Sequence, residues 1–362
     1  MKIGRLGHID GLRGIAATLV VLQHTSEFLH GIAPRGEFFT SIVRLVTWDW
    51  LNFGKIGVVA FFCISGFVIP FSFSGSRPLA KFLVSRFFRL YPMYWLSIAG
   101  AVFILPIVGI HAGLRQVLAN MTMVQVVFGQ KDLLGVYWTL LIELVFYSFC
   151  FLACWRSVLR SPFYFAGMGL TFLAVALLMA VANNTLGKGL PIALALGLAV
   201  MHFGGLTRLA VVERDDRARR LMPYATVSLL VLAVIACLLG YSRDTALGGA
   251  LPYVTSYVVA IVLFLCCAFF RIFSGRVLSF LGATSYALYL MHPLTALLAE
   301  HFGREVGWPL GAGVIIVIMA TSFPIAWLAH KLVERPMAQL AKRVESLLER
   351  GPASPSMTVP SV

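Results

Sequence analysis

The stretch "GLRGIAATLVVLQH", residues 11–24, places an arginine and a histidine in an otherwise apolar run. His24 follows Arg13 by three helical turns plus about 20°, so on an α-helix both side chains share one face, roughly 16 Å apart along the axis. Ionisable groups at such depth in a membrane usually face a cavity or a bundle interior and are candidates for function. A neutral imidazole can accept a proton. The competing interpretation of His24 is a structural histidine bonded to a neighbouring helix.

Other polar residues fall at a similar depth in later apolar segments. Glu143 in "VYWTLLIELVFYS" lies about 10 Å inside its segment. His292 in "SYALYLMHP" and Ser65 in "FFCISGFVIP" also lie well inside theirs. A carboxylate at the height of His24 can orient an imidazole or stabilise the imidazolium. For Ser65, close packing of two helices remains the competing explanation.

A pair of arginines occurs in "KFLVSRFFRLYP". Arg86 and Arg89 share a helical face and can hold phosphate groups through paired hydrogen bonds. The alternative is that they belong to the excess of Lys and Arg found on the cytoplasmic side of membrane proteins. Asp10 and Trp138 complete the candidate residues.

The amino-acid composition indicates that these candidate residues belong to a membrane protein. The chain has 362 residues, of which 59% are hydrophobic and 12% charged, more apolar than a soluble domain. Uncharged runs such as 251–270 match the roughly 20 residues that cross a bilayer. We therefore predict an all-α polytopic integral membrane protein, without the alternating pattern of a β-barrel. The six cysteines show no zinc-like spacing, so no metal is expected.

About ten transmembrane helices can be traced, with both termini inside the cell. On this topology the cytoplasmic segments hold 21 of the 29 Lys and Arg residues, as the positive-inside rule requires. The same rule explains the net charge of +14 without nucleic acid. The inner loops are 75–90, 156–162, 207–221 and 271–278. The predicted spans are 12–30, 55–74, 91–109, 136–155, 163–182, 190–206, 222–240, 251–270, 279–299 and 309–331.

One apolar stretch is ambiguous. Residues 113–129, "GLRQVLANMTMVQVVFG", resemble a span, but a crossing there would place the arginine cluster within 208–220 outside. We therefore predict an amphipathic segment on the outer surface. Trp138 lies with Trp48, Trp50 and Tyr137 where an aromatic belt is expected.

The order of these motifs resembles the membrane-bound acyltransferase 3 family. An arginine and a histidine eleven residues apart in a first membrane helix are followed by "FFCISGF", "RFFR", "YWTLLIE" and "SYALYLMHP". The resemblance covers about residues 8–336 and implies ten core helices. It also implies transfer of an acyl group, often acetyl, from acyl-CoA on the cytoplasmic side. The acceptors of the family are hydroxyls of surface carbohydrates, lipid-linked sugars, peptidoglycan or small molecules.

The resemblance implies a stand-alone enzyme in the bacterial cytoplasmic (inner) membrane. It implies acyl-CoA as donor, acetyl-CoA first of all, and contacts with membrane lipids. We expect a membrane domain over 8–336, a cytoplasmic surface helix over 337–350 and a disordered tail over 351–362. The first apolar run is expected to be a retained membrane helix and not a cleaved signal peptide, since no convincing cleavage site follows it. The outer loops 31–54 and 110–135 are expected to select the acceptor.

The residues suggest a division of labour for such a reaction. His24 is the candidate base, with Glu143 as the group that orients or stabilises it. Arg13, Arg86 and Arg89 are the candidates that hold the phosphates of CoA. Direct attack by the acceptor and an acyl-histidine intermediate both remain open.

Two other classes of protein share some of these features. A histidine and a glutamate at matched depth also suit a proton-coupled transporter of a small solute. The chain lacks a recognisable inverted repeat, which is typical of many transporters. A purely structural membrane protein would tolerate loss of His24.

The charge distribution generates a test of the topology. Reporter fusions after residues 215 and 345 should both read cytoplasmic, because the Arg-rich segments are expected inside. An extracytoplasmic reading at either position would mean that a crossing has been missed or invented, with residues 113–129 the first suspect.

Overall fold

The described part of the chain is helical and contains no β-strand. The computed structural model describes residues 6–32, 38–187, 189–242, 249–306 and 312–350. Within these ranges, eight helical segments are long and apolar enough to cross a membrane. The prediction of an all-α polytopic membrane protein is therefore confirmed.

The long helices follow one another with short connections between most of them. Each predicted span coincides with one of them. In chain order they are α1 (Gly7–Ile32), α3 (Phe53–Val68), α4 (Pro78–Ile107), α6 (Trp138–Trp155), α7 (Pro162–Leu186), α8 (Ile192–Val211), α9 (Asp216–Gly240), α10 (Leu251–Phe270), α11 (Arg276–Val306) and α12 (Ala312–Ala329).

Two of the predicted spans, α1 and α11, are not among the eight most apolar segments of the described residues. They have 26 and 31 residues, so at about 1.5 Å per residue both are long enough to cross. The number of ten spans and the orientation with both termini inside remain predictions.

The shorter elements lie mostly between these helices. They are α2 (Phe38–Arg44), η1 (Leu45–Trp50), η2 (Ile69–Ser72), α5 (Leu114–Asn120), η3 (Gln125–Phe128), η5 (His330–Glu334) and α13 (Arg335–Arg350). The ambiguous segment 113–129 therefore contains a helix of 7 residues and a 3-10 turn of 4 residues, which are too short to cross, as predicted.

Two inner loops are shorter than predicted. Residues 78–90 belong to α4, and the loop predicted over 207–221 contracts because α8 continues to Val211 and α9 begins at Asp216. Pro78 suits the first turn of a helix, and the Asp215 carboxylate accepts a hydrogen bond from the Ala218 N–H at 2.8 Å, which caps α9. Arginine side chains extend along helices, so their charge alone does not mark a loop.

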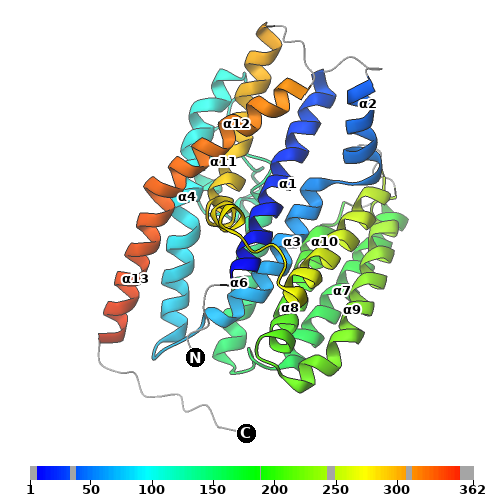
Figure 1. Cartoon of the computed structure of the whole chain (residues 1–362), viewed down its shortest axis with the longest axis vertical. Coiled ribbons are helices and arrows are strands. Elements are labelled where there is room, and N and C mark those ends of the chain that lie inside the picture. The colour runs from blue at the N-terminus through cyan, green and yellow to red at the C-terminus, as the bar shows by residue number, and fades with distance from the viewer. Residues whose placement is uncertain (1–5, 33–37, 188, 243–248, 307–311, 351–362) are drawn as a thin grey trace.

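The helices form two groups with α1 and α3 between them (Figure 1). α7, α8 and α9 pack together on one side, and α8 and α10 pack against α3. On the other side α11 packs against α12 and α4. α1 contacts α3, α11 and α12, so the helix that carries Arg13 and His24 lies at the centre of the bundle.

Close backbone contacts fix the central helices. A Cβ atom added to Gly66 in α3 would overlap the Met201 carbonyl of α8, and one added to Gly204 in α8 would overlap the Cys63 carbonyl of α3. A Cβ atom at Gly282 in α11 would overlap the Asp10 carbonyl of α1. Glycine permits such approach because it carries no side chain.

The last helical elements, α12, η5 and α13, follow one another without a break. The segment Ile315–Glu349 is helical over 35 residues, and α13 packs along the first part of α4, where Lys81 pairs with Glu349. Residues 337–350 thus belong to a helix that continues from α12 and rests on α4, and its predicted place at the cytoplasmic surface stays a prediction. The predicted disordered tail, 351–362, lies outside the described residues.

The close approach of α3 and α8 predicts that adding a single methyl group at their contact lowers the stability of the protein. Gly66→Ala should lower the free energy of unfolding by about 1–3 kcal/mol, because the two backbones must separate. The control is Gly167→Ala in α7, where a Cβ atom meets nothing within 4 Å and alanine favours the helix. Thermal unfolding in detergent measures both, and equal melting temperatures would contradict the packing argument.

Candidate active site

A cavity of about 90 Å³ lies among α1, α3, α4, α6 and α11; it is called the inner cavity because the predicted topology places it toward the cytoplasm, and the cavity further along α1 is called the outer one. The polar wall of the inner cavity comprises the three candidate arginines Arg13, Arg86 and Arg89, together with Glu143 and Ser65. The structure therefore brings five residues predicted from four sequence motifs to one cavity. Three guanidinium groups and one carboxylate line the cavity, and two further carboxylates behind this lining, Asp10 and Glu334, lie beside Arg13 and Arg89.

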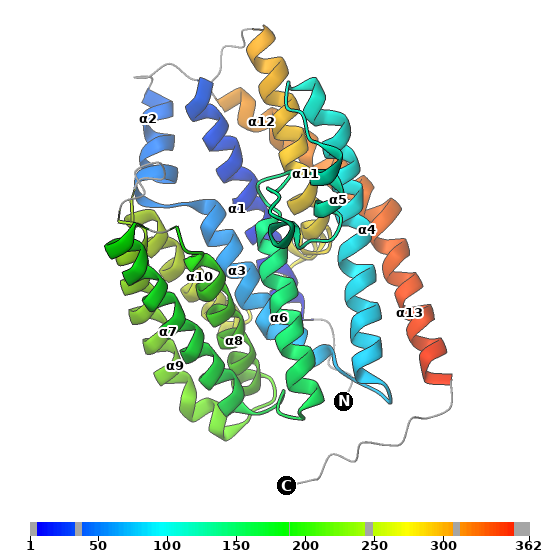
Figure 2. The ribbon, with the colours of Figure 1, turned by 180° about the vertical axis from the view of Figure 1, so that it is seen from behind.

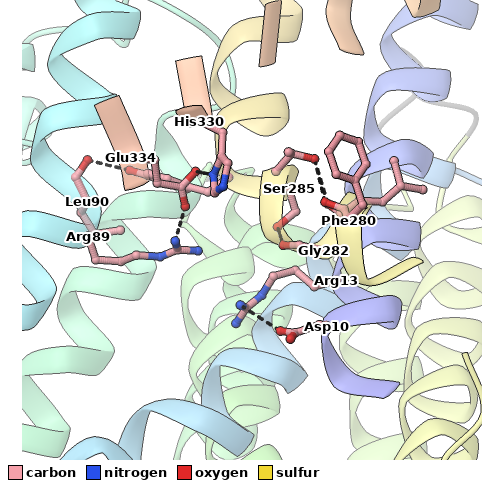
Figure 3. A network of polar contacts seen from close by, with 12 residues as sticks. Asp10, Arg13, Arg89, Leu90, Phe280, Gly282, Ser285, His330 and Glu334 are labelled. Atoms are coloured by element: carbon pink, nitrogen blue, oxygen red, sulfur yellow. Dashed lines mark hydrogen bonds and ion pairs between the residues drawn. The ribbon is translucent and has the colours of Figure 1, made fainter. Parts of the chain in front are cut away.

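The arginines of this cavity differ in their partners (Figure 3). Arg89 pairs with Glu334 from η5, and His330 Nδ1 lies 2.9 Å from the other oxygen of Glu334. Glu334 is 2% exposed. A buried carboxylate is costly unless a cation compensates it, so Arg89 has a structural role that its motif did not reveal. Arg13 lies 4.0 Å from Asp10, three residues earlier on α1.

Arg86 has no carboxylate within ion-pair distance among the residues that the structure describes. Its guanidinium carbon lies 5.8 Å from the ring centres of both Phe82 and Tyr147, which is within range of a cation–π interaction. Its Nε atom is buried and has no hydrogen-bond partner. A buried donor of this kind favours a ligand that supplies an acceptor.

Glu143 belongs to the inner cavity rather than to His24. The Tyr147 hydroxyl donates a hydrogen bond to Glu143 Oε1 at 2.8 Å, and the Ser65 hydroxyl lies 3.5 Å from the same atom. The expected pairing of Glu143 with His24 is thus not found. The sequence indicates how deep Glu143 and His24 lie along their helices, but not the direction in which each side chain points.

A larger outer cavity, of about 390 Å³, contains His24. It is further along α1, and its wall includes Glu27, Asn52, Lys55 and Trp138. Three tyrosines, Tyr241, Tyr253 and Tyr257, line it from the side of α9 and α10. The cavity combines hydrogen-bonding groups with aromatic rings.

His24 is oriented by a carboxylate of its own helix. Its Nδ1 lies 2.9 Å from Glu27 Oε2, and because a carboxylate only accepts, Nδ1 carries the hydrogen. The second nitrogen, Nε2, is then free to accept a proton. The Gln23 side-chain amide donates through Nε2 to Glu27 Oε1 at 3.1 Å, and its Oε1 accepts from the Phe53 N–H at 2.9 Å, which ties the His24–Glu27 pair to the start of α3.

His292 lies beside His24, although the two come from distant parts of the sequence. Their ring centres are 5.2 Å apart. His292 is fully buried, and its Nδ1 donates to the Leu288 carbonyl at 3.1 Å. Among the residues that the structure describes, no partner contacts its Nε2.

A thin wall separates the two cavities. Val58, Phe62 and Tyr289 line both of them. The Tyr289 hydroxyl is held by Thr139 Oγ1 at 2.7 Å and by the Val136 carbonyl at 3.1 Å. The arginine cluster and the His24–Glu27 pair thus lie on opposite faces of a layer of three side chains.

Comparison with known proteins agrees with this architecture. The family model described as an acyltransferase domain matches residues 6–331. The chain belongs to the acyltransferase 3 family.

The matching relatives are similar over limited regions. Nodulation protein 10 of Rhizobium leguminosarum bv. viciae is 30% identical over 166 residues, which are 40% of this chain and 43% of that protein. Protein 2 in the picA locus of Rhizobium radiobacter is 32% identical over 96 residues, or 25% of this chain and 41% of the relative. The chain therefore matches less than half the length of either protein. No solved structure matches it.

In this acyltransferase, the sequence motifs identified His24 and Arg89 but not the carboxylates that contact them, Glu27 and Glu334. Glu27, three residues after His24 on a helix, could have been found from its spacing. Glu334 gave a weaker signal, as a carboxylate at the end of an apolar segment. Its contact with Arg89 joins residues 245 positions apart, which no local pattern reveals.

The different partners of the two arginines predict different effects on stability. Arg89→Gln should lower the free energy of unfolding by roughly 2–3 kcal/mol, because Glu334 loses its cation. Adding Glu334→Gln should restore part of that loss, since the two residues act as a pair. Arg86→Gln is the matched control and should unfold near the wild-type temperature. Equal losses for Arg86→Gln and Arg89→Gln in thermal unfolding would contradict the assignment.

Proposed function

We propose that this acyltransferase moves an acyl group, acetyl first of all, from acyl-CoA to a hydroxyl of a surface or exported carbohydrate, a lipid-linked sugar or a small molecule. The observation that carries the proposal is the pair of cavities on α1, one lined by arginines and the other by a histidine–carboxylate pair. Val58, Phe62 and Tyr289 line both of them.

The inner cavity suits the donor. CoA carries several phosphate groups, and the guanidinium groups of Arg13 and Arg86 face the cavity with Arg89 nearby. Arginine matches phosphate geometry through paired donors. On the predicted topology this cavity lies toward the cytoplasm, where CoA is found. The thioester end of the donor then has to pass Val58, Phe62 and Tyr289 to reach His24.

The outer cavity suits a hydroxyl acceptor. Asn52, Glu27 and the tyrosines offer hydrogen bonds, and aromatic rings such as Trp138 provide flat apolar surfaces. An acceptor bound here has its hydroxyl close to His24 Nε2, the nitrogen left free by the bond to Glu27.

The chemical step then balances without a further reagent. His24 Nε2 accepts the proton of the hydroxyl while its oxygen attacks the thioester carbonyl carbon. The C–O bond of the ester forms, the C–S bond breaks, and the imidazolium returns the proton to the leaving thiolate. Glu27 stabilises the imidazolium while it exists. Attack by Nε2 itself, through an acyl-imidazole, uses the same residues, and mass spectrometry of acid-quenched enzyme would detect that intermediate.

Two experiments address donor and acceptor separately. Purified protein supplied with acetyl-CoA and a candidate acceptor should release free CoA thiol. Mass spectrometry of surface glycans and secreted metabolites, from cells with and without the gene, should reveal a molecule that carries the acyl group only when the gene is present. No acylated product in any fraction, and no CoA release, would refute the proposal.

Mutations of the His24–Glu27 pair test the assignment of the base. His24→Ala should reduce kcat by about 10²–10⁴-fold, the usual contribution of a general base. Glu27→Gln keeps the shape but removes the charge, so its loss should be smaller. The double variant should be no worse than His24→Ala alone, because both residues act on one proton.

The matched control is Thr171→Ala, which changes an exposed polar residue of α7 outside both cavities and should leave turnover unchanged. The decisive comparison is with His292→Gln. If His24→Ala retains wild-type turnover while His292→Gln is inactive, then the base belongs to α11 instead.

A further inference from the structure

Acyl transfer also needs a hydrogen-bond donor at the carbonyl oxygen of the thioester. When the acceptor attacks, the electron pair of the C=O bond moves onto that oxygen, and enzymes stabilise the resulting oxyanion with donors aimed at its position. In the proposed reaction the thioester comes from the inner cavity and reaches His24 in the outer one. Its carbonyl group therefore lies beside the residues that line both cavities, Val58, Phe62 and Tyr289.

Tyr289 supplies a hydroxyl group at this boundary, where α6 begins beside the middle of α11 (Figure 2). The side chains of Val58 and Phe62 are hydrocarbons and cannot donate. The Tyr289 hydroxyl lies 2.7 Å from Thr139 Oγ1 and 3.1 Å from the Val136 carbonyl oxygen. Thr139 lines the inner cavity and Val136 lines the outer one, so the hydroxyl group lies between the two.

The hydrogen bonds around Tyr289 leave its hydroxyl hydrogen free to change direction. The Thr139 hydroxyl also donates to the Val136 carbonyl, at 2.9 Å. The hydroxyl groups of Tyr289 and Thr139 thus have two hydrogens for three contacts. If Tyr289 turns its O–H toward a substrate, Thr139 still donates to the carbonyl, and no buried carbonyl loses its donor.

The candidate base lies on the same side of the site as this hydroxyl group. The ring centre of His292 is 5.2 Å from that of His24 and 6.1 Å from that of Tyr289. His24 and Tyr289 also line the outer cavity together. A thioester and an acceptor that meet there can contact the base and the tyrosine at the same time.

We propose that Tyr289 is a catalytic residue, whose hydroxyl group donates a hydrogen bond to the thioester carbonyl oxygen as negative charge develops on it. This inference rests on the proposed function and adds a residue to the same site. When the electron pair returns from the oxyanion, the C–S bond breaks and the thiolate takes its proton from His24, so Tyr289 keeps its own proton throughout. Attack by His24 Nε2 forms an oxyanion as well, and the same donor serves that route.

Tyr289→Phe tests the proposal because it removes the hydroxyl group and keeps the ring. Purified protein in nanodiscs receives acetyl-CoA and an extract of cells that lack the gene, which contains the unacylated acceptor. Release of CoA thiol gives kcat, and binding of acetyl-CoA without the extract gives Kd. We expect kcat to fall by about 10²–10³-fold, the usual effect of losing one oxyanion donor. The Kd for acetyl-CoA should stay at the wild-type value, because the oxyanion is absent from the ground state.

Two further variants separate donation from support of the structure. Thr139→Val removes the hydrogen bond to Tyr289 but leaves the tyrosine hydroxyl in place, so kcat should fall by at most about tenfold. Tyr164→Phe is the matched control: it removes a tyrosine hydroxyl that donates to the Phe149 carbonyl at 3.3 Å, and Tyr164 lines neither cavity. Its kcat should equal that of the wild type. Thermal unfolding of each variant reports whether it is folded.

Three results would overturn the assignment of Tyr289. They are wild-type kcat in Tyr289→Phe, a loss confined to the affinity for acetyl-CoA, and equal losses of kcat in Tyr289→Phe and Thr139→Val. The last result would mean that the hydrogen bonds support the structure and that the tyrosine donor is not required. If the wild-type protein releases no CoA with the extract, the proposed function is refuted and this inference falls with it, whereas an active Tyr289→Phe variant refutes this inference alone.

Discussion

The close packing of α1 against α3 and α11 is the constraint on which the site depends. One helix carries Arg13 and His24, and the backbones around it approach so closely that a methyl group on Gly57 or Gly282 would overlap α1. With its height and rotation fixed in this way, α1 presents Arg13 to one cavity and His24 to the other. Because Arg13 and His24 are about three helical turns apart on α1, one lines the inner cavity and the other lines the outer cavity.

The inner and outer cavities differ in how their charged groups are compensated. In the inner one, Arg89 is compensated by a buried carboxylate from η5, whereas the Nε atom of Arg86 has no partner. In the outer one, a carboxylate and an imidazole on one helix form a pair that can be neutral or charged as a proton arrives. Fixed positive charge suits binding of an anion, and a titratable pair suits proton transfer. In the proposed function, donor binding and base catalysis call for different groups, and α1 carries a candidate for each.

The sequence predicted the helices, the charged residues that line the inner cavity, and His24 and Trp138 of the outer cavity, because apolar length and polar interruptions are local signals. It extended the loop at 75–90 too far, since arginines on α4 were read as loop residues. It also paired Glu143 with His24, because distance along a helix axis says nothing about the direction of a side chain in the folded bundle. The Arg89–Glu334 contact and the wall of Val58, Phe62 and Tyr289 depend on tertiary packing, and no spacing rule anticipates them.

The wall between the cavities also has an electrical consequence. Two polar cavities that joined would form a conducting path across the membrane, and the three residues that line both of them, Val58, Phe62 and Tyr289, carry no charge. If water fills both cavities, most of the membrane voltage falls across this layer rather than across the whole bilayer. A proton that passes the layer then moves through nearly the full potential, worth about 2.3 kcal/mol per 100 mV. Under that condition the thickness of the layer, rather than that of the bilayer, sets the local electric field.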